Sequence, residues 1–176
     1  MRYIVLILLS IGGAVLSGAV GADPGIMGLQ IDIALLIILS AALLEKTSMP
    51  ILFAAVTGLL MDILFSTLLG VYAISYTVAA VVMLYAFRNR ARINVLMILA
   101  AGAGGYLIKE LVMALIVYAL GVRFSLLPMM ARYILPAAAL NAALLLVAYL
   151  LLSRVFQSRW MKPRQKHAAD DFSQIG

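Results

Sequence analysis

The chain has 176 residues, of which 66% are hydrophobic and only 11% are charged. Soluble domains carry roughly 45–50% apolar and about 25% charged residues, and a soluble domain of this length has too much surface to cover with so few charges. The composition therefore excludes a soluble globular domain and predicts an integral membrane protein.

A helix needs about 20 apolar residues to cross a hydrocarbon core about 30 Å thick. The segments that qualify are, in chain order, 3–22, 26–44, 50–69, 71–87, 93–121 and 130–152. Pro50 and Pro128 suit helix starts, and a tilt or a break at Gly102, Gly104 and Gly105 would absorb the length of the fifth segment. The sequence thus predicts an all-α fold, a polytopic bundle of six transmembrane helices over residues 1–153. A short basic tail, residues 154–176, is expected to be disordered.

The first segment has a competing interpretation as a signal peptide, because Arg2, an apolar run and a small-residue site at residues 20–22 occur together. The apolar run is about 20 residues long, against 7–15 in an ordinary signal peptide, which favours a retained span. Gly13, Ser17 and Gly21 recur every four positions, a spacing that suits close contact with another helix.

Basic residues predict the orientation, because cytoplasmic loops are rich in lysine and arginine. With both termini in the cytoplasm, ten basic residues lie inside and only Arg123 and Arg132 outside, while Lys109 lies within a span. The inside residues are Arg2, Lys46, Arg88, Arg90, Arg92, Arg154, Arg159, Lys162, Arg164 and Lys166. We expect the tail from Arg159 to Lys166, with Trp160 as an interfacial anchor, to contact anionic membrane lipid and not nucleic acid.

Several functional classes are excluded by what the sequence lacks. There is no cysteine, and the single histidine, His167, lies in the polar tail, so no thiolate or histidine metal centre and no catalytic triad can form within the membrane. No phosphate-binding loop is present, since the glycines at 102–105 lie inside an apolar helix with no strand before it. We find neither an internal repeat nor an inverted symmetry of the kind that is typical of transporters. We therefore expect a non-enzymatic protein without a cofactor.

We single out four polar residues inside the predicted spans: Asp62, Lys109, Glu110 and Asn141. A charge near mid-membrane costs about 2.5–3.5 kcal/mol on insertion scales, so we expect such residues to have a structural or functional role. Asp62 and Lys109 both fall in the outer half, about 18 and 24 Å from the inner boundary, and we expect them to pair between the third and fifth spans. Glu110 points about 100° away from Lys109 and is expected to face another helix or the outer surface. A ligand or proton site at Asp62 is the alternative to this structural pair.

The stretch GLLMDILFSTLLGVYAISYTVAA, residues 58–80, resembles the rod shape-determining protein MreD family of bacteria. Its Gly-x-x-x-Asp helix, followed by a glycine that opens the next helix, corresponds here to Gly58, Asp62 and Gly70. The preceding QIDIALLIILSAALLEK, residues 30–46, is similar to the family's Pro-Asp-Leu-Leu run, with Asp32 matched and Ile31 in place of proline.

The resemblance implies a non-enzymatic part of the bacterial cell-elongation machinery, a multi-pass protein of the cytoplasmic membrane. Its partners would be MreC and, indirectly, the MreB filament and the glycosyltransferase–transpeptidase pair that builds lateral peptidoglycan. A homodimer is also compatible with the resemblance. The family's fold is similar to that of the substrate-binding S components of energy-coupling-factor vitamin transporters, which supplies an alternative function. Ala14, Gly18 and Ala22 form only a loose version of the small-residue motif by which such subunits dock.

The six-span topology predicts which positions a membrane-impermeant thiol reagent reaches in intact cells. Because the chain is free of cysteine, single cysteines can be introduced without background. Cysteines at Gly25 and Ser125 should label from outside, and those at Asn89 and Ser173 should label only after the cells are opened. Labelling of the Ser173 position in intact cells would contradict the topology.

Overall fold

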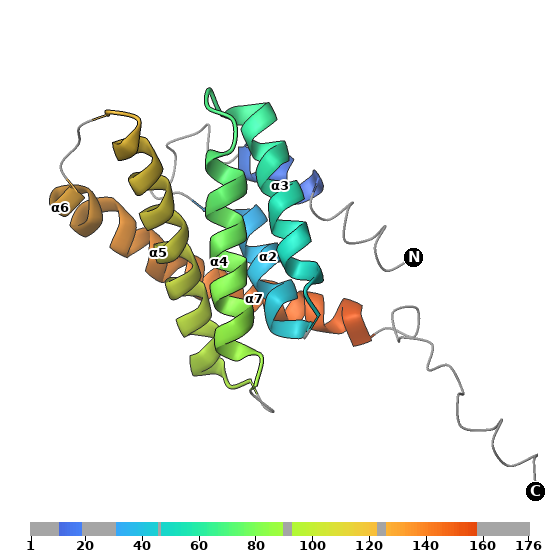
Figure 1. The fold of residues 1–176 in the computed structure, drawn as a ribbon. Coiled ribbons are helices and arrows are strands. Elements are labelled where there is room, and N and C mark those ends of the chain that lie inside the picture. The colour runs from blue at the N-terminus through green and yellow to red at the C-terminus, as the bar shows by residue number, and fades with distance from the viewer. Residues whose placement is uncertain (1–10, 19–30, 46, 90–92, 123–125, 158–176) are drawn as a thin grey trace, which may run out of the picture.

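The computed structural model describes residues 11–18, 31–45, 47–89, 93–122 and 126–157. All regular structure within these ranges is helical, which confirms the all-α class (Figure 1). Residues 11–18 form a helical segment. The helices that follow are α2 (Ile33–Leu44), α3 (Met49–Phe65), α4 (Val71–Phe87), α5 (Val95–Ala119), α6 (Leu126–Met129), the π-helical turn η1 (Met130–Ile134) and α7 (Leu135–Gln157).

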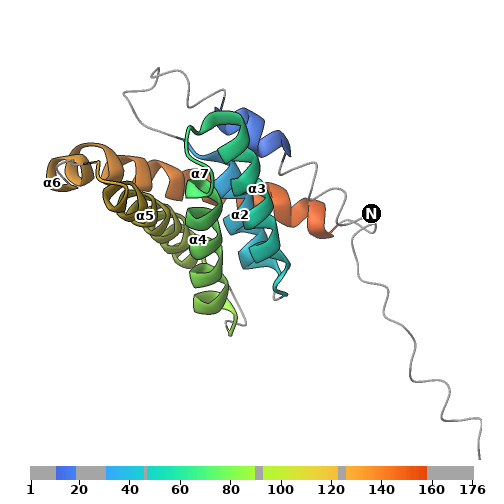
Figure 2. The same ribbon diagram turned by 45° about the horizontal axis from the view of Figure 1, so that its top comes forward.

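Helix α2 is the centre of the packing. It contacts α3, α4, α5 and α7, and most of its residues are buried. A helix that is hydrophobic on every side is kept from water, in a protein core or in a membrane, and α2 is apolar at every position except Ser40. The other helices therefore assemble around it, with α7 crossing behind the bundle at a steep angle to α3 and α4 (Figures 1 and 2).

The helix bounds agree with the predicted spans in part. The predicted segment 71–87 is confirmed, and α5 runs without a break through Gly102, Gly104 and Gly105, so its length is not absorbed by a hinge. The helix predicted from residue 26 begins only at Ile33, because Asp32 caps it with its own side chain. Residues 26–30 and most of the segment 3–22 lie outside the described residues.

Two further boundaries differ from the prediction. Helix α3 ends at Phe65 instead of residue 69, and the chain turns over residues 66–70. Pro50 lies in the first turn of α3 and Pro128 within α6, near the helix starts that they predicted. The last helical stretch begins at Leu126, and α7 continues to Gln157, past the predicted end at residue 152. The tail from residue 158 lies outside the described residues.

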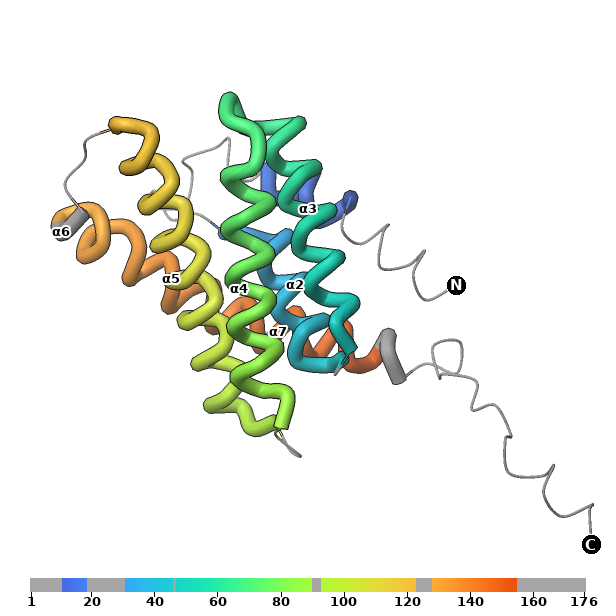
Figure 3. The backbone as a smooth tube through the Cα atoms, in the orientation of Figure 1, coloured from blue at the N-terminus to red at the C-terminus, as the bar shows by residue number. Residues whose placement is uncertain are grey.

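A proline explains the π-helical turn between α6 and α7. The Leu135 N–H donates to the carbonyl of Met130, five residues earlier. Pro136 has no N–H, and in an α-helix its ring would clash with the carbonyl of Arg132. Widening one turn relieves this clash, and the chain passes from α6 into α7 as one continuous path (Figure 3).

Small residues set the closest approaches between helices. A Cβ atom on Gly102 would lie 2.6 Å from the Cα of Ala142, so α5 and α7 touch through their backbones there. In the segment 11–18, Gly13 lies against Ile37, and the Ser17 hydroxyl accepts a 2.7 Å hydrogen bond from the Ala34 N–H. The predicted packing of this stripe against another helix is thus confirmed for Gly13 and Ser17, and the partner is α2.

Two helical stretches, Val95–Ala119 and Met130–Arg154, are long and apolar enough to cross a membrane by length and composition. Helices α2, α3 and α4 are also apolar but shorter. Large hydrophobic side chains are exposed on α3, α4, α5 and α7.

The contact at Gly102 predicts a loss of stability when a methyl group is added. Gly102→Ala should lower the free energy of unfolding by about 1–3 kcal/mol, the usual effect of overpacking, as measured by denaturation in detergent. Gly104→Ala is the matched control on the same helix, because its Cβ would meet only the flexible end of Met83 at 3.2 Å. This control should be neutral or slightly stabilising, since alanine favours helix. Equal losses for both variants would contradict the backbone contact.

Candidate functional site

Asp62, a residue of α3, caps the N-terminus of the next helix, α4. It lies near the end of α3 with 1% of its surface exposed. Its carboxylate accepts hydrogen bonds from the backbone N–H groups of Gly70 (2.9 Å), Tyr72 (2.9 Å) and Ala73 (3.0 Å). The first N–H groups of a helix have no partner within the helix and carry a partial positive charge. The negative charge of Asp62 is thus stabilised by the start of α4.

Gly58 and Gly70 make this cap possible. Gly58 lies one turn before Asp62 on the same face, and a Cβ there would be 2.4 Å from the Cα of Ala73. Only glycine lets α3 approach the first turn of α4 so closely. Gly70 has φ +98°, a left-handed conformation that residues with a side chain rarely adopt. Gly58, Asp62 and Gly70 therefore act as one structural unit, which we call the α3–α4 cap.

Asp32 is the centre of a second buried group, at the start of α2. One carboxylate oxygen accepts from the Leu35 N–H at 3.0 Å, so that Asp32 caps its own helix. The Tyr76 hydroxyl of α4 donates to both carboxylate oxygens, at 2.7 and 2.8 Å. The ammonium group of Lys109, on α5, lies 3.3 Å from Oδ2 of Asp32, the oxygen that does not bind Leu35.

Asn141 joins this group from α7. Its side-chain oxygen accepts from the Asp32 N–H at 3.1 Å, and its amide donates to the carbonyl of Ala137 at 2.9 Å. The residue is fully buried. We call Asp32, Tyr76, Lys109, Glu110 and Asn141 the polar core; it links α2, α4, α5 and α7 around the start of the central helix.

Lys109 has partners other than the one predicted. It contacts Asp32 and, at 2.6 Å, the carboxylate of its neighbour Glu110, while Asp62 binds the backbone of α4. The expected pair of Asp62 and Lys109 is therefore wrong, because the carboxylate of Asp62 is hydrogen-bonded by three backbone N–H groups and Lys109 pairs with Asp32 and Glu110.

Glu110 also differs from its expectation. It is buried, so it does not face the outer surface, and its carboxylate accepts a 2.6 Å hydrogen bond from the ammonium group of Lys109.

Aromatic rings complete the surroundings of Lys109. Its nitrogen lies 5.2 Å from the ring centre of Tyr106 and 5.8 Å from that of Tyr72, distances at which a ring face attracts a cation. The rings of Tyr72 and Tyr76 meet edge to face at 5.8 Å. Sequence reasoning missed these three tyrosines. The spacing of Tyr72 and Tyr76, one helical turn apart beside the Asp62 motif, was the available signal.

The polar core is a set of buried ion pairs and hydrogen bonds that connect helices. Two carboxylates share one ammonium group, and a phenol, an amide and a helix N-terminus supply further hydrogen bonds. Across the described residues, no three His, Cys, Asp or Glu side chains gather closely enough to hold a metal ion. Each charged group of the core faces another member of the core, so the arrangement fixes helices relative to one another.

Comparisons with known proteins gave no match to a family model, to a curated protein or to a solved structure. The interpretation therefore depends on the residues and their contacts.

The observed partners predict two different outcomes for two matched double-mutant cycles. Asp32→Asn combined with Lys109→Met should show a coupling energy of about 0.5–3 kcal/mol, as residues in contact do. Asp62→Asn combined with Lys109→Met should show a clearly smaller coupling, because Asp62 binds backbone N–H groups. The free energy of unfolding in detergent is the measurement. A coupling for Asp62 as large as that for Asp32 would restore the pair of Asp62 and Lys109.

Proposed function

We propose that the chain is a membrane scaffold of the MreD type, which acts with MreC in the machinery that builds lateral peptidoglycan and maintains rod shape. The observation that carries the proposal is the α3–α4 cap. Gly58, Asp62 and Gly70 are the residues on which the resemblance to the MreD family rests, and in this chain their contacts give each of them a required role. A chance match in apolar sequence would not be expected to select three cooperating residues.

The proposal includes a multi-pass position in the bacterial cytoplasmic membrane, as a six-span bundle with both termini in the cytoplasm. Two features support it. The exposed faces of the helices carry large apolar side chains such as Leu52, Ile63, Leu96 and Leu115. The buried charged and amide groups find partners inside the bundle, which is what a hydrocarbon environment requires.

A scaffold without catalytic chemistry is supported by the use of the polar residues. The carboxylates of Asp32 and Asp62 each hold a helix start, and Lys109 is enclosed between two carboxylates and two rings. Interactions of this kind fix a rigid helical surface, and a rigid surface suits a protein whose task is to hold a partner in place.

The physiological test is depletion in a rod-shaped host. Depletion should give round, widening cells that still divide, and expression of the unaltered chain should restore rods. Asp62→Leu should fail to restore them because the cap is lost, whereas Gly12→Ala, which adds a methyl group in open space, should succeed. The membrane level of each variant, measured by immunoblot, separates loss of folding from loss of activity.

Affinity purification in mild detergent distinguishes the two functional classes. Recovery of MreC with the tagged chain supports the scaffold. Recovery of an ATPase and its coupling subunit, together with rod-shaped cells that require a vitamin, would replace the proposal by an energy-coupling-factor S component.

A further inference from the structure

The end of α3 and the turn that joins it to α4 expose large apolar side chains. The exposed residues from 64 to 69 are Leu64, Phe65, Thr67, Leu68 and Leu69, and Leu69 is 76% exposed. Between Lys46 and Arg88 the sequence has one charged residue, Asp62, and this residue is buried. A turn that ends in water normally carries charged side chains, whereas the exposed surface here is leucine and phenylalanine with the single hydroxyl of Thr67.

Several backbone groups of the turn and of the start of α4 form hydrogen bonds within the hairpin. Asp62 binds the N–H groups of Gly70, Tyr72 and Ala73. The Ser66 hydroxyl accepts from the Leu68 N–H at 3.1 Å and donates to the Leu68 carbonyl at 2.8 Å. In hydrocarbon no water can bind such groups, and irregular backbone is tolerated there only when the protein satisfies it.

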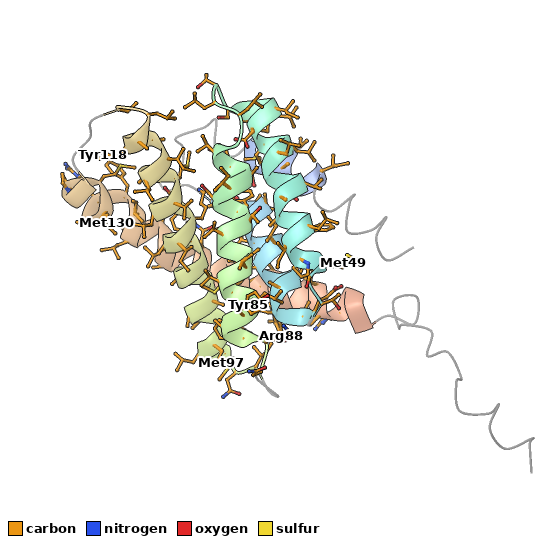
Figure 4. The ribbon with its side chains drawn as sticks, viewed as in Figure 1. Met49, Tyr85, Arg88, Met97, Tyr118 and Met130 are labelled. Carbon is orange, nitrogen blue, oxygen red and sulfur yellow. The ribbon has the colours of Figure 1, made fainter. Side chains whose placement is uncertain are left out.

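The hairpin is also short for a span. Helices α3 and α4 have 17 residues each, so each rises about 25 Å, against a hydrocarbon core of about 30 Å. Arg88 directly follows α4 at the far end from the turn and is exposed there, on the side proposed to be cytoplasmic (Figure 4). With Arg88 at the cytoplasmic edge of the hydrocarbon core, the helix length brings the turn at most to the outer edge of that core.

The outer ends of the neighbouring helices differ from this turn. Tyr118 near the end of α5 is 61% exposed, and Arg132 and Tyr133 of η1 are exposed as well. Tyrosine and arginine are the residues that mark the boundary between membrane and water. The α3–α4 turn has neither.

We propose that the end of α3 and the α3–α4 turn, residues 64–70, lie inside the outer leaflet and contact lipid acyl chains through Leu64, Leu68 and Leu69. The buried carboxylate of Asp62 makes this position tolerable, because it supplies the acceptors that water would supply elsewhere. The inference rests on the membrane position proposed above and is independent of the identity of the partner.

Tryptophan reporters in lipid nanodiscs test the proposal. Trp160 is the single tryptophan of the chain, so Trp160→Phe gives a silent background for Leu69→Trp and, as a second reporter, Leu64→Trp. Leu59→Trp, at an exposed position in the middle of α3, is the control for hydrocarbon. Asn89→Trp, at an exposed position beyond the end of α4, is the control for water. The quenchers are lipids brominated on the acyl chains and aqueous iodide, which reaches both faces of a nanodisc.

The proposal expects Leu69→Trp and Leu64→Trp to be quenched by brominated lipid to an extent comparable with Leu59→Trp, and to be protected from iodide. Iodide quenching as strong as that of Asn89→Trp would place the turn in water and overturn the inference. Protection from both quenchers would mean that protein covers the turn, which also overturns it. If Leu59→Trp itself were not quenched by brominated lipid, the membrane position would fail, and the inference with it.

Discussion

The structure depends on the need to pair the backbone N–H groups at helix starts inside an apolar body. An unpaired buried N–H group is as costly as a lost hydrogen bond, and each helix start presents several of them. At the starts of α2 and α4 the chain meets this need with carboxylates, which accept more hydrogen bonds than a hydroxyl group and also complement the positive end of the helix. Asp32 does so for α2 from within its own chain segment, and Asp62 does so for α4 from the preceding helix.

The two carboxylates have different consequences for packing. Asp62 requires α3 to lie against the first turn of α4, and Gly58 permits that distance. Asp32 brings the start of the central helix to a phenol of α4, an ammonium group of α5 and an amide of α7. A buried charge that loses its partner is strongly destabilising. The carboxylate of Asp32 therefore ties α2 to α4 and α5, and its backbone N–H adds α7 through Asn141. The arrangement of the helices around α2 therefore follows from polar contacts as well as from apolar surface.

The sequence predicted the helical class and several helix bounds because these depend on local signals. Gly70 and Arg88 mark both ends of α4, and the composition alone predicts apolar helices. The start of α2 was predicted too early, because the length that a membrane span needs was given more weight than Asp32, a local N-cap residue directly before the apolar run. The predicted partner of Lys109 was wrong for a different reason. Depth along a helix limits which residues can meet but does not determine which helix faces turn toward one another. Asp32 was recognised only as a motif residue, and no partner was predicted for it.

The internal use of the polar residues has a consequence for recognition. Asp32, Asp62 and Lys109 are engaged inside the bundle, so a partner within the membrane would meet mainly the exposed apolar faces. On α3 the exposed side chains of Leu52, Val56, Leu59 and Ile63 follow one face at helical spacing. Association between helices in lipid depends on the fit of such surfaces, because lipid tails are as apolar as the side chains and no hydrophobic gain distinguishes them. Fit requires a surface of fixed shape. The α3–α4 cap and the polar core, by fixing α3 on α4 and α4 on α2, provide the rigidity that recognition by shape would need.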